Sequence, residues 1–189
     1  MLMMFKDILR TLTFTLVPGV IFAFLVMSAL PTFKKSGFKN TIKDFFKSLK
    51  NKDRLFLFLL LIYFFIVIYR TLFQRDFSYD SLSNVFGGWK IFKTQYTGLD
   101  YQVIGNIAMF LPFGLLWALT FKREEKSAKT LLKTLLSSLC FSVFIEITQL
   151  IFSKGTFQFS DIVYNTLGGV LGAVIFIIIN LIIEKKRSK

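Results

Sequence analysis

Five apolar stretches, each about as long as a bilayer-spanning helix, constrain the fold of this chain more than any other feature of its sequence. They occupy residues 11–30, 55–73, 102–121, 131–152 and 161–183. A helix needs about 20 mainly apolar residues to cross the hydrocarbon core of a bilayer. The sequence therefore predicts an all-α fold, a polytopic bundle of about five transmembrane helices, which forms a single membrane domain over residues 1–189.

The composition supports this architecture and limits the chemistry of the chain. The chain is 54% hydrophobic yet carries a net charge of +13, so apolar and basic residues must occupy different segments. One Cys and no His exclude an internal disulfide and argue against a Cys/His metal site, and we expect no metal and no cofactor. The first apolar stretch contains Pro18 and Gly19 and lacks a small-residue cleavage site, so we interpret it as a retained helix.

Lys and Arg are distributed unevenly between the two sides of this predicted bundle. Residues 32–54, residues 122–130 and the tail after residue 183 hold 16 of them, whereas the segments on the other side hold six. Basic loops stay in the cytoplasm. The bias predicts an amino terminus outside the cell and a carboxyl terminus in the cytoplasm. Because the basic residues follow topology in this way, we expect no nucleic-acid partner.

Two of the predicted loops have a pattern of their own. Residues 36–52 place apolar residues, mostly Phe, at helical spacing with Lys mainly between them. This pattern predicts a basic amphipathic helix on the inner leaflet, or a segment that only fixes topology. The loop over residues 74–101 holds the aromatic residues Phe77, Tyr79, Phe86, Trp89, Phe92 and Tyr96. They predict either an aromatic belt at the membrane interface or part of a lid over an outward-facing groove.

Polar side chains inside the apolar stretches form the candidate site. In a transmembrane helix such residues face a protein interior or a functional cavity, because lipid cannot solvate them. With the predicted topology, six of them lie within ~9 Å of the outer helix ends, at about 1.5 Å per residue. These are Arg70, Asn106, Glu146, Gln149, Asp161 and Asn165. We predict that they cluster near the outer surface of the membrane.

Spacing and charge support this cluster. Glu146 and Gln149 lie three residues apart and Asp161 and Asn165 four apart, so each pair shares one helix face. Buried acids need a counter-charge. Arg70 is the basic residue within a helix at that depth, while Arg75 and Lys154 are nearby in the loops. The alternative is that these side chains only hold the helices together by hydrogen bonds, with Asp161 as a helix cap.

Glycine and proline positions predict how the helices pack. Gly168 and Gly172 have the spacing that lets two helices approach closely. Pro112 removes one helical hydrogen bond and is predicted to kink the third helix next to Asn106. We assign Pro112, Gly114, Gly168 and Gly172 to packing and kinking.

Three motifs in the second half of the chain resemble the pattern of the VanZ-like family. They read NIAMFLPFG over residues 106–114, SVFIEITQ over 142–149 and GTFQFSDIVYNTLGG over 155–169. Together they place a VanZ-like core at residues 70–175. Gln158 and Ser160 stand where the family pattern has acids, which argues against multi-carboxylate or metal chemistry. The resemblance implies a multi-pass protein of the bacterial cell membrane and a link to resistance against the glycopeptide teicoplanin.

The favoured functional hypothesis is a protein that binds or handles a cell-envelope lipid or its headgroup at the outer leaflet. Its expected partners are membrane lipids, among them a cell-wall lipid precursor, or a lipidated glycopeptide. One alternative is an enzyme that acts on such a lipid with Glu146 and Asp161 as acid and base. The absence of His and of a positioned nucleophile favours binding over catalysis. The other alternative is a lipid transporter or flippase.

Overall fold

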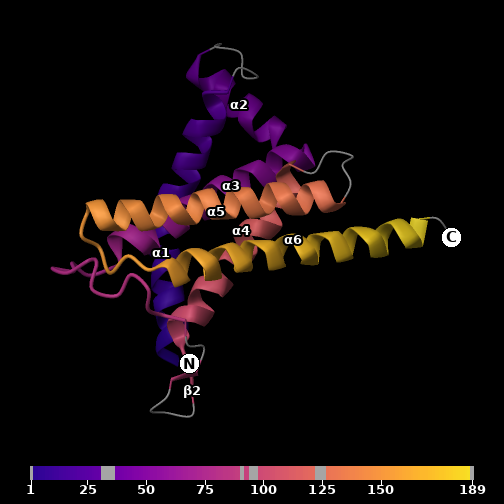
Figure 1. Ribbon diagram of the computed structural model, residues 1–189. Coiled ribbons are helices and arrows are strands. Elements are labelled where there is room, and N and C mark those ends of the chain that lie inside the picture. The colour runs from indigo at the N-terminus through magenta and orange to yellow at the C-terminus, as the bar shows by residue number, and fades with distance from the viewer. Residues whose placement is uncertain (1, 31–36, 90–91, 94–97, 122–126, 188–189) are drawn as a thin grey trace. The chain divides into compact units, whose positions relative to one another are not determined.

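The computed structural model describes residues 2–30, 37–89, 92–93, 98–121 and 127–187. The chain divides into two compact units, Met1–Arg70 and Thr71–Lys189, and each is described by itself (Figure 1). The elements in chain order are α1 (Leu2–Ser28), α2 (Phe38–Ser48), α3 (Lys52–Ile68), the π-helical turn η1 (Tyr69–Phe73), β1 (Phe92–Lys93), β2 (Gly98–Leu99), α4 (Tyr101–Phe121), α5 (Ser127–Ile151) and α6 (Phe159–Arg187).

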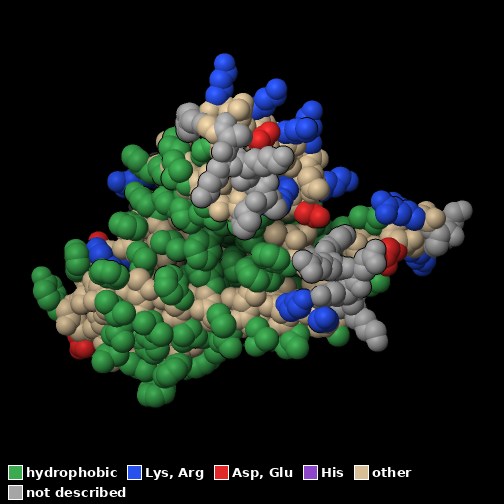
Figure 2. Space-filling model, turned by 90° about the horizontal axis from the view of Figure 1, so that it is seen from above, with side chains coloured by type: hydrophobic (Ala, Val, Ile, Leu, Met, Phe, Trp, Pro, Cys, Tyr) green, Lys and Arg blue, Asp and Glu red, His purple; other side chains and the backbone are tan. Residues whose placement is uncertain are grey.

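Within the described ranges, five helical segments are long and apolar enough to cross a membrane. They are Leu9–Ser28, Lys52–Phe73, Tyr101–Phe121, Ser127–Ile151 and Phe159–Arg187. Large hydrophobic side chains are exposed along four of these segments and at both ends of Tyr101–Phe121, and hydrophobic side chains cover much of the face seen in Figure 2. The prediction of five long apolar helices is confirmed. The direction in which they cross a membrane stays a prediction.

Several helices extend beyond the apolar stretches of the sequence. The Asn51 side chain accepts hydrogen bonds from the backbone N–H of Asp53 at 2.8 Å and of Arg54 at 3.4 Å, so α3 begins before residue 55. At the other end of the chain, α6 continues past residue 183 to Arg187. Helical hydrogen bonding does not stop where hydropathy falls. Lys34, Lys35, Lys90, Tyr96, Lys122, Arg123 and Lys126 lie outside the described residues.

In the first unit, α1 packs against α3 and also against α2. Gly19 of α1 lies against Ile62 of α3, where an added Cβ would be 3.4 Å from the side chain. The amphipathic helix predicted at residues 36–52 is present as α2. Its Phe45 is buried and makes edge-on ring contacts with Phe24 at 4.9 Å and Phe58 at 5.5 Å. Phe45 therefore packs onto neighbouring helices rather than into lipid. The contact of α2 with the inner leaflet stays a prediction.

In the second unit, α6 packs against both α4 and α5. Figure 1 shows α5 and α6 running beside each other, with α4 crossing them. A Cβ added to Gly114 of α4 would overlap the Gly169 carbonyl of α6, and one added to Gly168 would overlap the Ile107 carbonyl. Gly172 lies equally close to Leu111. The backbones of α4 and α6 are thus in direct contact, on either side of Pro112.

The core of the second unit is apolar beyond this crossing. Phe110, Phe113 and Phe141 are buried with ring centroids 5.0 to 5.7 Å apart. Further along, Ala118 and Ala173 form a buried cluster with Phe176. Towards the end where α4 and α6 begin and α5 ends, the interior becomes polar. We call this the site end of the second unit.

Candidate functional site

One face of α5 is polar along most of the helix, and it is buried. Five buried side chains follow one another at four-residue intervals: Thr130, Thr134, Ser138, Ser142 and Glu146. Side chains four residues apart lie on the same face of a helix. This face points at α6, because Asn165 Nδ2 donates to Ser142 Oγ at 2.9 Å and Gly169 lies against Ser138.

Two acidic side chains are buried at the site end. Glu146 near the end of α5 accepts a hydrogen bond at Oε2 from the backbone N–H of Gln158, at 3.2 Å. Asp161 lies in the first turn of α6. There the unpaired backbone N–H groups and the helix dipole stabilise negative charge.

Polar groups from other elements surround the Asp161 carboxylate. Gln102 of α4 directs its Nε2 at Asp161 Oδ2 over 3.3 Å and at Gln158 Oε1 over 3.4 Å. Asn106, one turn further along α4, is buried as well. Arg75 NH2 forms an ion pair with Asp161 Oδ2 at 3.6 Å. Three segments that are far apart in the sequence therefore converge on one carboxylate.

Arg75 connects the buried cluster to the surface. Its NH1 donates to Gln149 Oε1 at 3.2 Å, and Gln149 Nε2 in turn donates to the backbone carbonyl of Thr71 at 3.0 Å. The Arg75 side chain is 28% exposed, whereas that of Asp161 is only 3% exposed. Gly155, at φ +81°, allows close approach, because an added Cβ would lie 3.0 Å from Arg75 NH1. One side of the guanidinium is thus held by the cluster while part of the side chain remains exposed.

The structure brings five of the six predicted site residues to the site end, namely Asn106, Glu146, Gln149, Asp161 and Asn165. Arg70 belongs to the first unit and is not placed against this cluster, so its role as counter-charge stays a prediction. The cation that the structure pairs with Asp161 is Arg75. Sequence reasoning counted Arg75 only as a nearby loop residue.

Arg75 reaches the cluster because residues 74–89 fold back along residues 153–159. The backbone N–H of Ser78 donates to Ser153 O at 2.8 Å, and that of Phe157 donates to Ser81 O, also at 2.8 Å. Phe159 N–H donates to Val85 O at 3.0 Å. We call residues 74–89 the covering segment, because these bonds fix it along the connection between α5 and α6.

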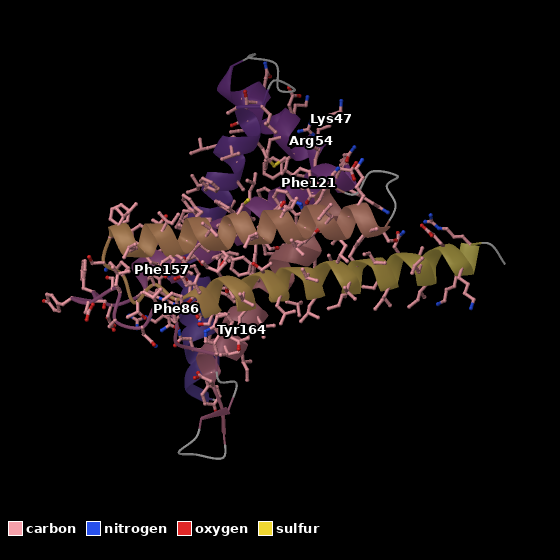
Figure 3. All side chains as sticks on the ribbon, in the orientation of Figure 1. Lys47, Arg54, Phe86, Phe121, Phe157 and Tyr164 are labelled. Carbon is pink, nitrogen blue, oxygen red and sulfur yellow. The ribbon has the colours of Figure 1, made fainter. Side chains whose placement is uncertain are left out.

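The aromatic side chains of the covering segment are largely exposed. Phe77, Tyr79 and Phe86 present most of their surface outward, and the Phe86 ring stacks on Phe159 at 5.5 Å. Tyr164 of α6 donates its hydroxyl to the carbonyl of Trp89 at 3.0 Å. Figure 3 labels Phe86, Phe157 and Tyr164, which lie near the beginning of α6. The exposed rings and the backbone contacts do not decide between an aromatic belt and a lid, so both stay predictions.

Three buried polar atoms at and below the site end have no hydrogen-bond partner among the described residues. They are Asn106 Nδ2, Ser138 Oγ and Asn165 Oδ1. Among the residues that the structure describes, no group of three or more His, Cys, Asp or Glu side chains is arranged to hold a metal ion. The site can therefore offer one guanidinium, two carboxyl groups and several amides and hydroxyls to a ligand.

Sequence reasoning missed the polar face of α5 and the contribution of Gln102. The repetition of Thr130, Thr134, Ser138 and Ser142 at four-residue spacing was a readable signal. Gln102 carried no such signal, because it stands alone at the beginning of α4. Gln158 and Ser160, noted only as departures from a motif, are both buried within the cluster.

Five long apolar helices and a buried polar cluster at one end of a helical unit define a polytopic α-helical membrane protein. The sequence profile of the VanZ/LLP1 family matches residues 54–180, so the chain belongs to this family and the resemblance seen in its motifs is confirmed. Protein VanZ of Enterococcus faecium is 33% identical over 91 residues, which cover 48% of this chain and 53% of that protein. The chain thus spans about half the length of this curated relative. No solved structure matches the chain.

Proposed function

We propose that this protein, in the bacterial cell membrane, binds the headgroup of an envelope lipid in the outer leaflet. In this proposal the amino terminus lies outside, the carboxyl terminus lies in the cytoplasm, and the site end faces outward. The binding groups are Arg75 at the surface and the buried side chains behind it, Asn106, Glu146, Gln149, Asp161 and Asn165.

The arrangement of Arg75 is the observation that carries the proposal. A guanidinium has five N–H donors in a planar fork that matches phosphate and carboxylate oxygens. Asp161 and Gln149 hold Arg75 from the buried side, and 28% of its side chain remains exposed. A side chain held in this way loses little conformational freedom when it binds an anion. The phosphate of a lipid headgroup at the bilayer surface is such an anion.

The exposed aromatics of the covering segment support a location at the membrane surface. The rings of Phe77, Tyr79 and Phe86 in the covering segment are exposed, and aromatic side chains are enriched at headgroup level. Lys154, whose Nζ lies 3.5 Å from the centroid of the Phe77 ring, adds a second cation near Arg75. Both features favour a headgroup-binding site over hydrogen bonding that only joins helices.

The family resemblance implies a link to teicoplanin, and we extend the proposal to it. Teicoplanin acts outside the membrane and carries a lipid tail, so a lipid site in the outer leaflet lies in the compartment where the drug works. In cells that express the protein, we expect Arg75→Gln to lower teicoplanin resistance and Arg187→Gln, at the exposed end of α6, to leave it unchanged. Equal resistance of both variants at equal expression would remove the link between this site and the drug.

Native mass spectrometry of the full-length protein purified with its lipids tests the binding site directly. We expect a co-purifying lipid on the wild type and on Arg187→Gln, and its loss from Arg75→Gln. Because Arg75→Gln leaves Asp161 buried without its cation, the double variant Arg75→Gln/Asp161→Asn serves as a neutral version that keeps the cluster polar. A lipid retained by both Arg75 variants at the wild-type level would refute the proposal. A chemically altered lipid on the wild type would instead favour the enzyme hypothesis.

A further inference from the structure

The helices that α2 packs against fix its rotation about its own axis. Phe45 is buried and makes edge-on ring contacts with Phe24 of α1 and Phe58 of α3. Ile42 and Leu49, on the same side of α2, are half-buried. The sequence pattern predicts that this apolar side lies in lipid, but in the structure the protein itself covers Phe45. A partner that approaches α2 from outside therefore meets the opposite side of the helix.

The side of α2 that points away from α1 and α3 is basic. Its exposed residues are Lys39, Lys43, Phe46, Lys47 and Lys50, and we call this set the basic face. Four of them follow one another at intervals of four, three and four residues, and such spacing places side chains along one face of a helix. None of the four lysines pairs with a carboxylate of the residues that the structure describes. Their ammonium groups are thus free to bind an external anion.

The ring contacts of Phe45 place α2 at the level where α1 ends and α3 begins. Phe24 lies four residues before Ser28, the last residue of α1, and Phe58 lies six residues after Lys52, the first residue of α3. At about 1.5 Å per residue, both aromatic residues are within ~9 Å of a helix end. Both helices belong to apolar segments long enough to cross a membrane, so these ends lie at the level of the lipid headgroups.

The beginning of α3 adds to the positive charge of this region. Residues 39–54 contain six basic residues and two acidic ones. Lys52 and Arg54 follow α2 directly, and Figure 3 labels Lys47 and Arg54 on either side of the turn between the two helices. The phosphates of an anionic bilayer surface complement this charge, because Lys and Arg near such a surface are attracted to it. Phe46 is 64% exposed, and aromatic side chains are enriched at the same depth in a membrane.

We propose that the basic face of α2 binds anionic phospholipids in the leaflet at this end of α1 and α3. In the topology proposed above, this is the inner leaflet. The four lysines attract the lipid phosphates, and the ring of Phe46 inserts beside them. Because Phe45 packs onto protein, the surface exists before lipid binds and does not have to fold on the membrane. It acts independently of the headgroup site of Arg75.

Quenching of tryptophan by brominated lipids reports which phospholipid lies next to α2. In the full-length protein with Trp89→Phe and Trp117→Phe, the substitution Phe46→Trp places the only tryptophan on the basic face. The protein is reconstituted into equimolar phosphatidylcholine and phosphatidylglycerol, with one or the other lipid brominated. We expect phosphatidylglycerol to bind at this position about fivefold more strongly, the factor that one lysine near an anionic surface supplies. The preference should decrease with added salt, because the lysines are exposed.

Charge variants in the same protein show which residues select the lipid. Replacing all four lysines of the basic face by Gln should bring the preference close to one, and Gln keeps nearly the helix propensity of Lys. Lys43→Gln/Lys50→Gln should give an intermediate preference, and it remains informative if the fourfold variant does not fold. The control is Lys185→Gln/Lys186→Gln/Arg187→Gln, which removes three positive charges from the last turn of α6. It should leave the preference at residue 46 unchanged.

Three results would overturn the proposal. If neither brominated lipid quenches the tryptophan of Phe46→Trp, the basic face lies in water or binds a soluble anionic partner. Equal quenching by the two lipids would show contact with the bilayer without selection by charge. A preference that survives the replacement of all four lysines would assign the selection to other groups. The headgroup site of Arg75 would stand in each case, since none of these variants changes it.

Discussion

Replacing Gly114 by Ala tests the direct contact of α4 and α6, on which the shape of the site end depends. A Cβ at residue 114 would lie 2.6 Å from the carbonyl carbon of Gly169 and would overlap the carbonyl oxygen. This oxygen cannot turn aside, because it belongs to the interior of α6. The strain can be relieved only if the helices separate, which also loosens the contacts of Gly168 with Ile107 and of Gly172 with Leu111.

The cost follows from the packing, and Gly105 provides a matched control. Insertion of a methyl group into a close-packed contact costs about 1–3 kcal/mol. Gly105 lies on the same helix, and nothing lies within 4 Å of an added Cβ there. Gly105→Ala should therefore stabilise α4 by up to about 1 kcal/mol through helix propensity. The two variants should differ in unfolding free energy by roughly 1–4 kcal/mol, in favour of Gly105→Ala.

Thermal unfolding of both variants in the same detergent, followed by circular dichroism, measures this difference. For a chain of this size, about 1 kcal/mol corresponds to roughly 2–4 °C in melting temperature. We expect Gly114→Ala to melt several degrees below the wild type and Gly105→Ala at or above it. If Gly114→Ala melts together with Gly105→Ala, the backbone contact between α4 and α6 is wrong.

Three further predictions concern the site and the topology. In a double-mutant cycle of Arg75→Gln and Asp161→Asn, thermal unfolding should give a coupling free energy of about 1 kcal/mol or more. A fully exposed ion pair would give less, whereas Asp161 is buried. Additive effects of the two substitutions would contradict the ion pair. In a Cys140→Ser background, a membrane-impermeant maleimide should label Ser83→Cys in intact cells and Lys185→Cys only after permeabilisation, and the reverse pattern would invert the proposed topology. Brominated lipids should quench the fluorescence of Trp89, which is exposed in the covering segment, in a Trp117→Phe variant; emission unchanged by bromination would place this segment away from the bilayer.

The parts of the fold that the sequence predicts are those with a local cause. The five long helices follow from runs of apolar residues, and the shared faces of Glu146 with Gln149 and of Asp161 with Asn165 follow from the helical period. Phe45 shows the limit of this reasoning. The amphipathic spacing predicts that Phe45 lies in an apolar environment. It does not predict whether lipid or the helices α1 and α3 provide that environment, and the structure shows the helices.

The cation of the site shows a second limit. Sequence reasoning favoured Arg70 as the counter-charge, because the depth of a residue inside a predicted helix can be estimated from its distance to the helix end. Arg75 reaches Asp161 through backbone hydrogen bonds between two loop segments, and their pairing has no periodicity to reveal it. The role of Gln102 likewise depends on how α4 lies against α6, which is a tertiary property.

The hydrogen bonds between the covering segment and residues 153–159 also determine when the site end can form during synthesis of the protein. The residues that bond, such as Ser81 and Phe157, are separated by more than 70 positions along the chain. At about 5–20 residues per second, a ribosome needs roughly 4–15 s to synthesise that interval. During this time the covering segment lacks the residues that accept and donate its backbone hydrogen bonds, and Arg75 lacks its ion-pair partner Asp161. The site end is therefore completed only after α6 has been synthesised, and interruption of synthesis before α6 would leave the covering segment without the backbone hydrogen bonds that hold it.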